Sequence, residues 1–211
     1  ILKSNNIIND RMDLIYSLKA KKNKTEINNI KKAHLEDGLA LTRFIFWIKE
    51  NFRKKKITEI SAENKIYSLR KKNKNFKFLS FPTISSTGAN GAIIHYRATK
   101  KSNKVLRKGN LYLIDSGGQY FYGTTDVTRT LSLQNDNERI KNIYTRVLKG
   151  HIAVANYKLT KKTTGSDVDK IARKYLKEIN LDYNHGTGHG VGHFSNVHEG
   201  PQSISKYSNK S

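Results

Sequence analysis

The spacing of hydrophobic residues along the chain predicts four amphipathic helices separated by strands. Apolar side chains recur at near-helical intervals, with polar residues at the start of each run. This pattern predicts helices over four segments: 25–52, 58–72, 136–157 and 166–179. We expect Thr25 to cap the first helix and Thr58 or Ser61 to cap the second. Ser166 and Asp169 have the spacing of a capping box at the start of the fourth.

The region between the second and third helices has the character of β-strands. Residues 76–94 alternate in a strand-like way, and Asn90-Gly91 has the signature of a tight turn. Residues 111–114 form a short apolar run typical of a buried strand, and residues 125–131 are rich in Thr and Val. Helices combined with an antiparallel sheet predict an α+β fold, with the helices packed on one side of the sheet.

Two aspartates flank the turn between these last two strands. Asp115 follows the buried strand and Asp126 lies in the next one, so a meander can bring the two side chains together. Two adjacent carboxylates without a cation repel each other, and one would take up a proton. Bound metal ions remove that cost. The plainer alternative is that both aspartates cap turns by bonding backbone amides.

Histidine and glycine alternate near the carboxyl end of the chain, in residues 185–193. Each glycine would cost about 1 kcal/mol in a helix interior, so we expect this segment to be extended or looped. Imidazoles on such a segment suit metal binding or proton transfer. A lone histidine is more often structural, but the glycines on either side leave His189 unshielded.

Five motifs, taken in order, resemble the catalytic domain of aminopeptidase P, the Xaa-Pro aminopeptidase branch of the pita-bread metallopeptidases. They are Ile93-Ile-His-Tyr, Asp115-Ser-Gly-Gly-Gln-Tyr, Gly123-Thr-Thr-Asp-Val-Thr-Arg-Thr, His185-Gly-Thr-Gly-His-Gly-Val-Gly and Asn196-Val-His-Glu-Gly-Pro. The likeness covers roughly residues 15–205. It implies an incomplete pita-bread fold, with residues 23–211 as the N-terminal part of the catalytic domain. Residues 1–22 would be a linker or the tail of a preceding domain.

The resemblance implies a centre with two divalent metal ions. On this reading Asp115 binds one ion, Asp126 bridges both, and His189 is the third protein ligand in this chain. Carboxylate-rich sites favour manganese, while cobalt or zinc would also fit such a mixture of oxygen and nitrogen ligands.

Three further histidines receive roles from the same resemblance. His95 and His198 would act near the substrate as catalytic residues, one of them bonding the scissile carbonyl or the tetrahedral intermediate. His185 would line the pocket for the proline ring, together with His198. The alternative for His95, which follows two isoleucines, is a buried histidine bonded to a carbonyl. His193 has no counterpart among the family's ligands, and we expect it to be exposed.

The activity implied is metal-assisted hydrolysis that removes the first residue of peptides with proline second. Prolidase and creatinase chemistry are the nearest alternatives within that fold. The family adds two glutamate ligands downstream of residues 196–201, and the chain contains no segment matching them. With three of five ligands, we expect this chain alone to be inactive or nearly so. It would then be a gene fragment, one piece of a split enzyme, or a truncated protein.

The strongly basic composition adds one alternative, binding of RNA or of an acidic partner. The chain has 211 residues, 40 Lys plus Arg and 17 Asp plus Glu, giving a formal charge of +23. This leaves open a non-catalytic protein that binds RNA or an acidic partner, although solvated lysines explain the charge more simply. Cysteine is absent, and no apolar run is long enough for a transmembrane helix. We therefore expect a cytoplasmic enzyme with a peptide substrate and without membrane or nucleic-acid partners; a homodimer stays open.

Overall fold

The computed structural model describes residues 14–134, 137–194 and 196–207. The first half of the fold contains three helices, six strands and a short 3-10 helix. These are α1 (Leu14–Ala20), α2 (Lys24–Asn51), α3 (Glu59–Arg70), β1 (Phe76–Leu79), β2 (Ile84–Thr87), η1 (Gly88–Ala92), β3 (Leu111–Ser116), β4 (Gly118–Tyr120), β5 (Gly123–Thr124) and β6 (Val127–Ser132). The second half contains α4 (Glu138–Ala155), α5 (Gly165–Lys177), β7 (Gly188–Gly190) and β8 (Glu199–Ile204). The α+β class is confirmed.

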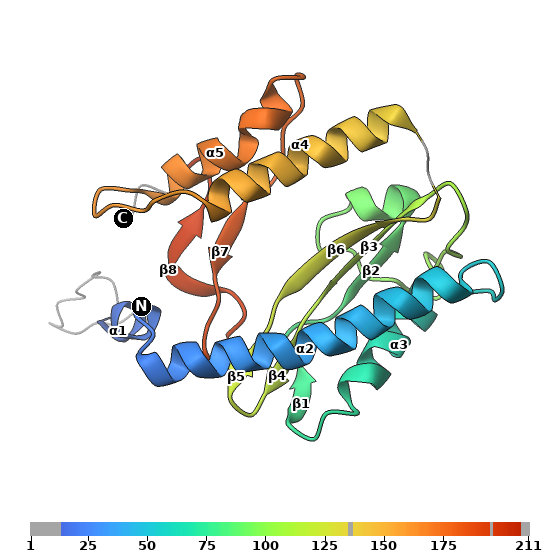
Figure 1. Cartoon of the computed structure of the whole chain (residues 1–211), viewed down its shortest axis with the longest axis horizontal. Helices are drawn as coiled ribbons and strands as arrows, with labels where there is room; N and C mark the ends of the chain where they lie inside the picture. The colour runs from blue at the N-terminus through green and yellow to red at the C-terminus, as the bar shows by residue number, and fades with distance from the viewer. Residues whose placement is uncertain (1–13, 135–136, 195, 208–211) are drawn as a thin grey trace, which may run out of the picture.

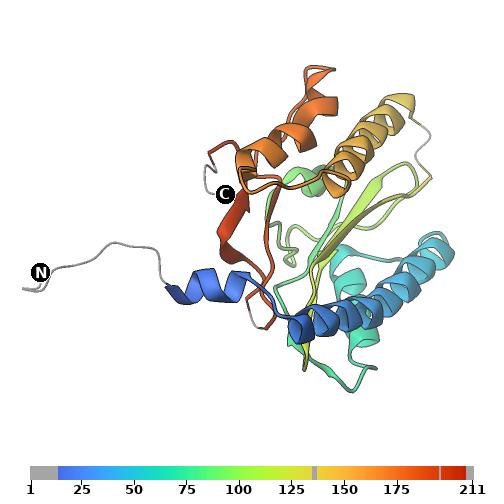
Figure 2. The same cartoon turned by 60° about the vertical axis from the view of Figure 1, so that its left-hand side comes forward.

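The strands form three small antiparallel sheets, in the orders β1-β4-β5, β2-β3-β6 and β7-β8. Figures 1 and 2 show α2 and α3 side by side against the strands of the first half, and α4 and α5 beside β7 and β8. Helix α3 contacts β2, and α5 contacts both α4 and β8. Each half therefore places its pair of helices on one side of its strands. No described helix is both long and apolar enough to cross a membrane.

The hydrophobic core lies between α2, α3 and the β2-β3-β6 sheet. Apolar residues at helical spacing on α2 and α3 meet alternating side chains of β3, which is the packing that the two periodicities require. The buried cluster consists of Leu41, Phe44, Ile48, Ile57, Ala62, Ile66, Leu106, Tyr112, Ile114 and Leu133. This core fixes β3, and with it the position of Asp115.

The helix starts differ from two of the predicted caps. Helix α2 is capped by Asn23, whose side chain accepts from the Glu26 N–H while the Glu26 carboxylate accepts from the Asn23 N–H. Thr25 therefore lies inside the helix, because Asn23 has a glutamate at the right distance to complete the capping box. For α3 the first of the two predicted alternatives is confirmed: Thr58 is the cap, and Ser61 lies inside the helix, where its side chain completes the capping box.

Helix α5 is capped by Thr164 with Asp167, so the predicted box of Ser166 and Asp169 is wrong. Asp169 is instead buried and bonded to Arg173 and Thr187. The start predicted for the third helix, residue 136, lies outside the described residues.

The Asn90-Gly91 signature does not mark a hairpin. The chain after β2 continues into the 3-10 helix η1, and β2 pairs with the distant β3. The Asn90 side-chain amide donates instead to both carboxylate oxygens of Glu59, 31 residues earlier at the start of α3, at 3.0 and 3.1 Å. A buried carboxylate therefore determines the fold of this turn.

Candidate metal centre

The antiparallel pairing of β3 and β6 brings the two predicted aspartates together. The register places Asp115 opposite Thr128. Asp126 precedes β6 and lies two residues before Thr128, so its side chain is a diagonal neighbour of Asp115 on the same face. Burial raises the pKa of Asp115, and the charge of Asp126 raises it further, against the lowering effects of Thr128 and His189. Its Oδ1 atom is buried and accepts no hydrogen bond from the described residues.

The β7-β8 hairpin brings His189 to the same place. Its Nε2 atom lies 3.2 Å from Asp126 Oδ2, and its Nδ1 atom lies 2.8 Å from the Gly190 carbonyl oxygen. The hydrogen bond to Asp126 raises the pKa of His189; burial acts in the opposite direction, and the Gly190 carbonyl and the charge of Asp115 add to the rise. Asp115, Asp126 and His189, which are far apart in the chain, thus converge as the sequence predicted.

His198, which was predicted to act near the substrate, lies directly beside Asp126 and His189. Its ring packs edge-on against that of His189, with ring centroids 4.2 Å apart. One ligand atom from each of Asp126, His189 and His198 lies within 4.8 Å of the others, so this set could hold a metal ion. Asp115 interacts with Asp126 and His189 but is not one of the three residues that meet this 4.8 Å criterion.

His95 comes next in the row, with its ring centroid 6.4 Å from that of His198. It is exposed, which rules out the alternative of a buried structural histidine, and its backbone is left-handed at φ 54°. Its neighbour Tyr96 is buried and its hydroxyl donates to Glu59 Oε2 at 2.8 Å. Glu59 therefore anchors the segment that presents His95. Sequence reasoning missed Glu59, because a glutamate at the first position of a helix looks like an ordinary charge near the helix N-terminus.

His185 lies in a different environment. Its Nδ1 atom is 2.7 Å from the Gly186 carbonyl oxygen, and its ring centroid is 5.6 Å from that of Tyr183. Among the described residues, no contact of the His185 side chain reaches His189 or His198. Its backbone carbonyl accepts a hydrogen bond from Arg173 at 2.6 Å. The structure thus joins His189, His198 and His95, and leaves His185 on its own loop.

The glycines of residues 185–193 allow close backbone packing against β8. A side chain at Gly190 would place its Cβ 2.3 Å from the Glu199 carbonyl oxygen, and one at Gly192 would lie 2.5 Å from that of Asn196. His193 is half-buried rather than exposed as expected, and its carbonyl accepts from the Thr124 hydroxyl at 3.3 Å. Residues 188–190 of this segment form a strand that pairs with β8, and the rest is loop, so the prediction of an extended or looped segment is confirmed.

Glu199, beside His198, is buried and paired with two lysines. Lys22 Nζ lies 2.5 Å from its Oε2 atom and Lys19 Nζ lies 3.2 Å from Oε1. Burial raises the pKa of Glu199, but the bonds and charges of the two lysines outweigh that effect and leave the pKa below its usual value. Through these pairs the segment around α1 contacts β8 directly.

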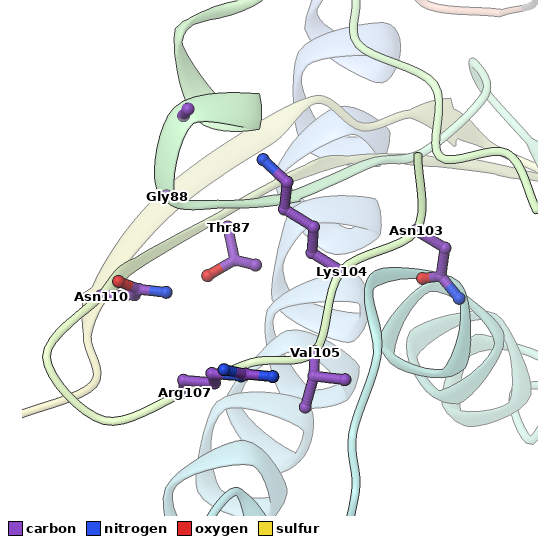
Figure 3. Close-up of a pocket in the computed structure, with 8 residues that line it drawn as sticks. Thr87, Gly88, Asn103, Lys104, Val105, Arg107 and Asn110 are labelled. Atoms are coloured by element: carbon purple, nitrogen blue, oxygen red, sulfur yellow. The ribbon is translucent and has the colours of Figure 1, made fainter. Parts of the chain in front are cut away.

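A surface pocket of about 500 Å³ lies away from this group. It is lined by Thr87, Gly88, Ala89, Asn103, Lys104, Val105, Arg107 and Asn110 (Figure 3). Thr87 pairs with Tyr112, whereas Asp115 pairs with Ile84 at the other end of the same two strands. The lining contains neither a carboxylate nor an imidazole, so this pocket is not the metal centre.

Comparisons with known proteins show the family of this chain. Residues 28–211 match metallopeptidase family M24, and the chain belongs to this family. It is 44% identical over 205 residues to a probable Xaa-Pro aminopeptidase P of Podospora anserina, covering 96% of this chain and 30% of that protein. It is 46% identical over 200 residues to Xaa-Pro aminopeptidase 1 of Dictyostelium discoideum, covering 93% of this chain and 32% of that protein.

Solved structures show the same relationship. The X-prolyl aminopeptidase of Caenorhabditis elegans, described as a cytosolic enzyme with a di-nuclear active site, superposes with a TM-score of 0.86 at 40% identity, covering 92% of this chain and 32% of that one. The prolidase of Pyrococcus furiosus gives 0.81 at 30% identity, covering 93% of this chain and 55% of that one. The pita-bread fold is thus confirmed, and the chain spans about a third of the length of the curated relatives.

Proposed function

We propose that this chain carries part of the active site of a two-metal Xaa-Pro aminopeptidase, with Asp115, Asp126 and His189 as metal ligands. The observation that carries the proposal is their convergence: the β3-β6 register brings the aspartates together, and the β7-β8 hairpin adds His189 within 3.2 Å of Asp126. The names of the relatives support the peptidase assignment and the preference for proline in second position.

The residues fit divalent ions. A buried carboxylate oxygen without a hydrogen-bond donor, as at Asp115 Oδ1, is an acceptor that a cation would satisfy. The charge of Asp126 raises the pKa of Asp115, which is unfavourable without a cation. Bound cations would neutralise both carboxylates and so remove this repulsion. Two carboxylates with an imidazole suit manganese, and also cobalt or zinc. The position of His198 within the same group makes it an additional candidate for contact with a bound ion.

The chemistry divides between the ions and the protein. Bound divalent ions would supply Lewis acidity and lower the pKa of a bound water molecule. Asp115 and Asp126 supply the negative charge that holds them, and His189 must give up its proton to bind. His198 and His95 lie in a row beside His189, and one of them would donate a hydrogen bond to the scissile carbonyl or to the tetrahedral intermediate.

Selectivity for proline would come from the shape of the substrate pocket. Proline has no backbone N–H and a fixed φ, so the bond before it needs a dedicated surface. We assign the ring-binding role to His185 and His198, and we expect the peptide's free amino end to lie at the metals. We further propose manganese as the native ion and the cytoplasm as the place of action, as in the cytosolic relative from C. elegans.

Calorimetric titration of the 211-residue chain with Mn²⁺ tests the ligand set. We expect binding by the wild-type chain and loss of binding in Asp126→Asn, which keeps the shape but removes the charge. Glu50→Gln is the matched control, because Glu50 is exposed and pairs only with Lys54 at 3.5 Å among its described contacts. Equal affinity in Asp126→Asn and the wild type would contradict the assignment.

We expect the chain by itself to hydrolyse Xaa-Pro peptides poorly or not at all, because three protein ligands hold two divalent ions weakly. The measurement is release of the first residue from such a peptide with added Mn²⁺. Turnover by the 211-residue chain that Asp126→Asn abolishes would show this expectation to be wrong while supporting the metal ligands.

A further inference from the structure

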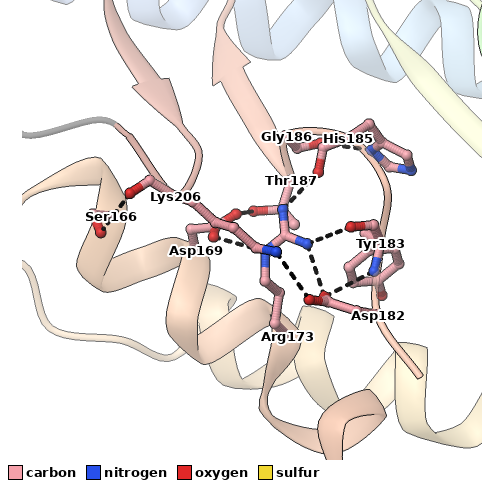
Figure 4. A network of polar contacts seen from close by, with 9 residues as sticks. All are labelled: Ser166, Asp169, Arg173, Asp182, Tyr183, His185, Gly186, Thr187 and Lys206. Carbon is pink, nitrogen blue, oxygen red and sulfur yellow. Dashed lines mark hydrogen bonds and ion pairs between the residues drawn. The ribbon is translucent and has the colours of Figure 1, made fainter. Parts of the chain in front are cut away.

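Arg173 is at the centre of a buried polar network that joins α5 to the loop before β7 (Figure 4). Its three guanidinium nitrogens donate to four acceptors. These are Asp169 Oδ2 at 2.7 Å, Asp182 Oδ1 at 2.8 Å, and the carbonyl oxygens of Tyr183 at 2.7 Å and His185 at 2.6 Å. We call this set the Arg173 clamp. Arg173 and Asp169 are almost fully buried, so the bonds are made away from solvent.

The clamp holds the backbone of the loop and extends to the strand pair that carries His189. Two of its four acceptors are main-chain carbonyls, so the guanidinium fixes where the chain runs. The other oxygen of Asp169 accepts from the Thr187 hydroxyl at 2.8 Å, and the Thr187 N–H donates to the Ile204 carbonyl of β8 at 2.8 Å. His189 follows two residues later. The loop is thus bonded on one side to α5 and on the other to β8.

We propose that Arg173 is a positioning residue of the metal centre, acting through this loop on His189 and on His185. The inference rests on the proposed function, because it assigns Arg173 a role toward the proposed metal ligand. Residues that orient a metal ligand from outside commonly change metal affinity by about 10–100-fold when removed. This role requires arginine. Its planar guanidinium can bond several separated acceptors at once, whereas the single ammonium of lysine cannot.

The charges of the clamp are balanced, which favours a fixed geometry. Asp169 and Asp182 face Arg173, and Lys206 Nζ lies 3.3 Å from the second oxygen of Asp182. The side-chain bond from Arg173 lowers the pKa of Asp182 to about 2, and the bond to Asp169 raises that of Arg173. The lowered pKa of Asp182 and the raised pKa of Arg173 keep this ion pair charged at neutral pH, the condition in which metal would bind.

The test compares Arg173→Lys with a matched variant, Arg146→Lys, in the 211-residue chain. Arg146 also donates from a helix to a carbonyl and a carboxylate, those of Tyr175 and Glu178, and none of its described hydrogen bonds reaches the loop. We expect Arg173→Lys to bind Mn²⁺ about 10–100-fold more weakly than the wild type. The absorption spectrum of bound Co²⁺ should change with it. Arg146→Lys should match the wild type in both measurements.

Amide hydrogen exchange supplies a readout that does not depend on metal. We expect faster exchange over residues 183–189 in Arg173→Lys, with α2 and α3 unchanged. If Arg173→Lys does not fold, Asp182→Ala replaces it: it removes one half-exposed acceptor and leaves the Asp169 pair, and it should weaken Mn²⁺ binding in the same direction.

The outcomes separate the two proposals. If the wild-type chain takes up no metal, the proposed ligand set fails, while selective exchange in Arg173→Lys would still support the clamp as the device that orders the loop. A folded Arg173→Lys chain with wild-type Mn²⁺ affinity and wild-type exchange would overturn the inference.

Discussion

Each half of the molecule contains one buried arginine–aspartate pair, and the two pairs differ in which elements they connect. In the first half, Arg70 of α3 donates to both oxygens of Asp37 of α2, at 2.7 and 2.9 Å, and neither side chain is exposed. Tyr120 and Ser116 complete this group from β4 and β3. In the second half, Arg173 and Asp169 lie one turn apart on the same helix. The first pair joins different elements to one another, while the second lies within one helix and the remaining bonds of Arg173 join that helix to a loop.

The difference indicates which part of the structure each pair stabilises. The Asp37–Arg70 pair lies among four elements in the hydrophobic half, so it can break only if those elements separate. The Arg173 clamp can open by moving the loop alone, because Asp182 is already part-exposed. We therefore expect the first pair to govern global unfolding and the second to govern local order at the candidate site.

The largest effect should follow from Asp37→Ala, which leaves Arg70 buried without its counter-charge. Removing one partner of a buried pair costs about 3–5 kcal/mol. Urea unfolding of the metal-free chain should show this loss, with a lower midpoint. A loss no greater than that of Glu50→Ala, which breaks an exposed pair, would show that the two halves of the molecule do not differ in this way.

Asp169→Ala should cost less, about 1.5–3 kcal/mol, the range for hydrogen bonds to charged groups, because Arg173 keeps Asp182 and two carbonyls. Hydrogen exchange is the decisive measurement. Loss of protection should be confined to α5 and residues 182–190. Equal loss of protection in α2 would place this pair in the global unfolding unit instead.

Thr164→Ala should cost about 1 kcal/mol, because it removes the capping box of α5 without touching the clamp. Asn23→Ala, which uncaps α2, should cost a similar amount. Thermal or urea unfolding of the two variants checks this equality. A much larger loss for Thr164→Ala would mean that the second half depends more on its helix termini than on Arg173.

The smallest effect is the pH dependence that the His189–Asp126 contact adds. The pKa of His189 is raised above 6.5 in the folded chain, so protonated His189 stabilises the fold. This contribution is complete below pH 6.5 and is lost as pH rises through the raised pKa. Unfolding free energies of the metal-free chain over a pH series should show the decline, and Asp126→Asn should flatten it.

The sequence predicted the regular parts of this structure better than its buried polar groups. Helices α2 to α5 and strand β3 were predicted because their apolar periodicity is strong, whereas α1 was not predicted. The pairing of Asp115 with Asp126 was predicted because a meander can bring the two strands together, and β3 does pair with β6. Two caps were misplaced, since Asn23 and Thr164 compete with nearby residues of the same type. The bonds of Arg173 could not be read from the chain, because half its acceptors are backbone carbonyls, which carry no residue signature. Glu59 was missed because a glutamate at a helix start looks like an ordinary charge, and its partners come from three separate segments.

The pairing of Glu199 with Lys19 and Lys22 has a practical consequence for anyone who expresses this protein. A version that starts at the first residue of α2 would delete both counter-charges and leave a bare carboxylate under the hairpin that carries His189. Cloning boundaries that look harmless, because they preserve the long helices, would then perturb the candidate site from the opposite end of the polypeptide.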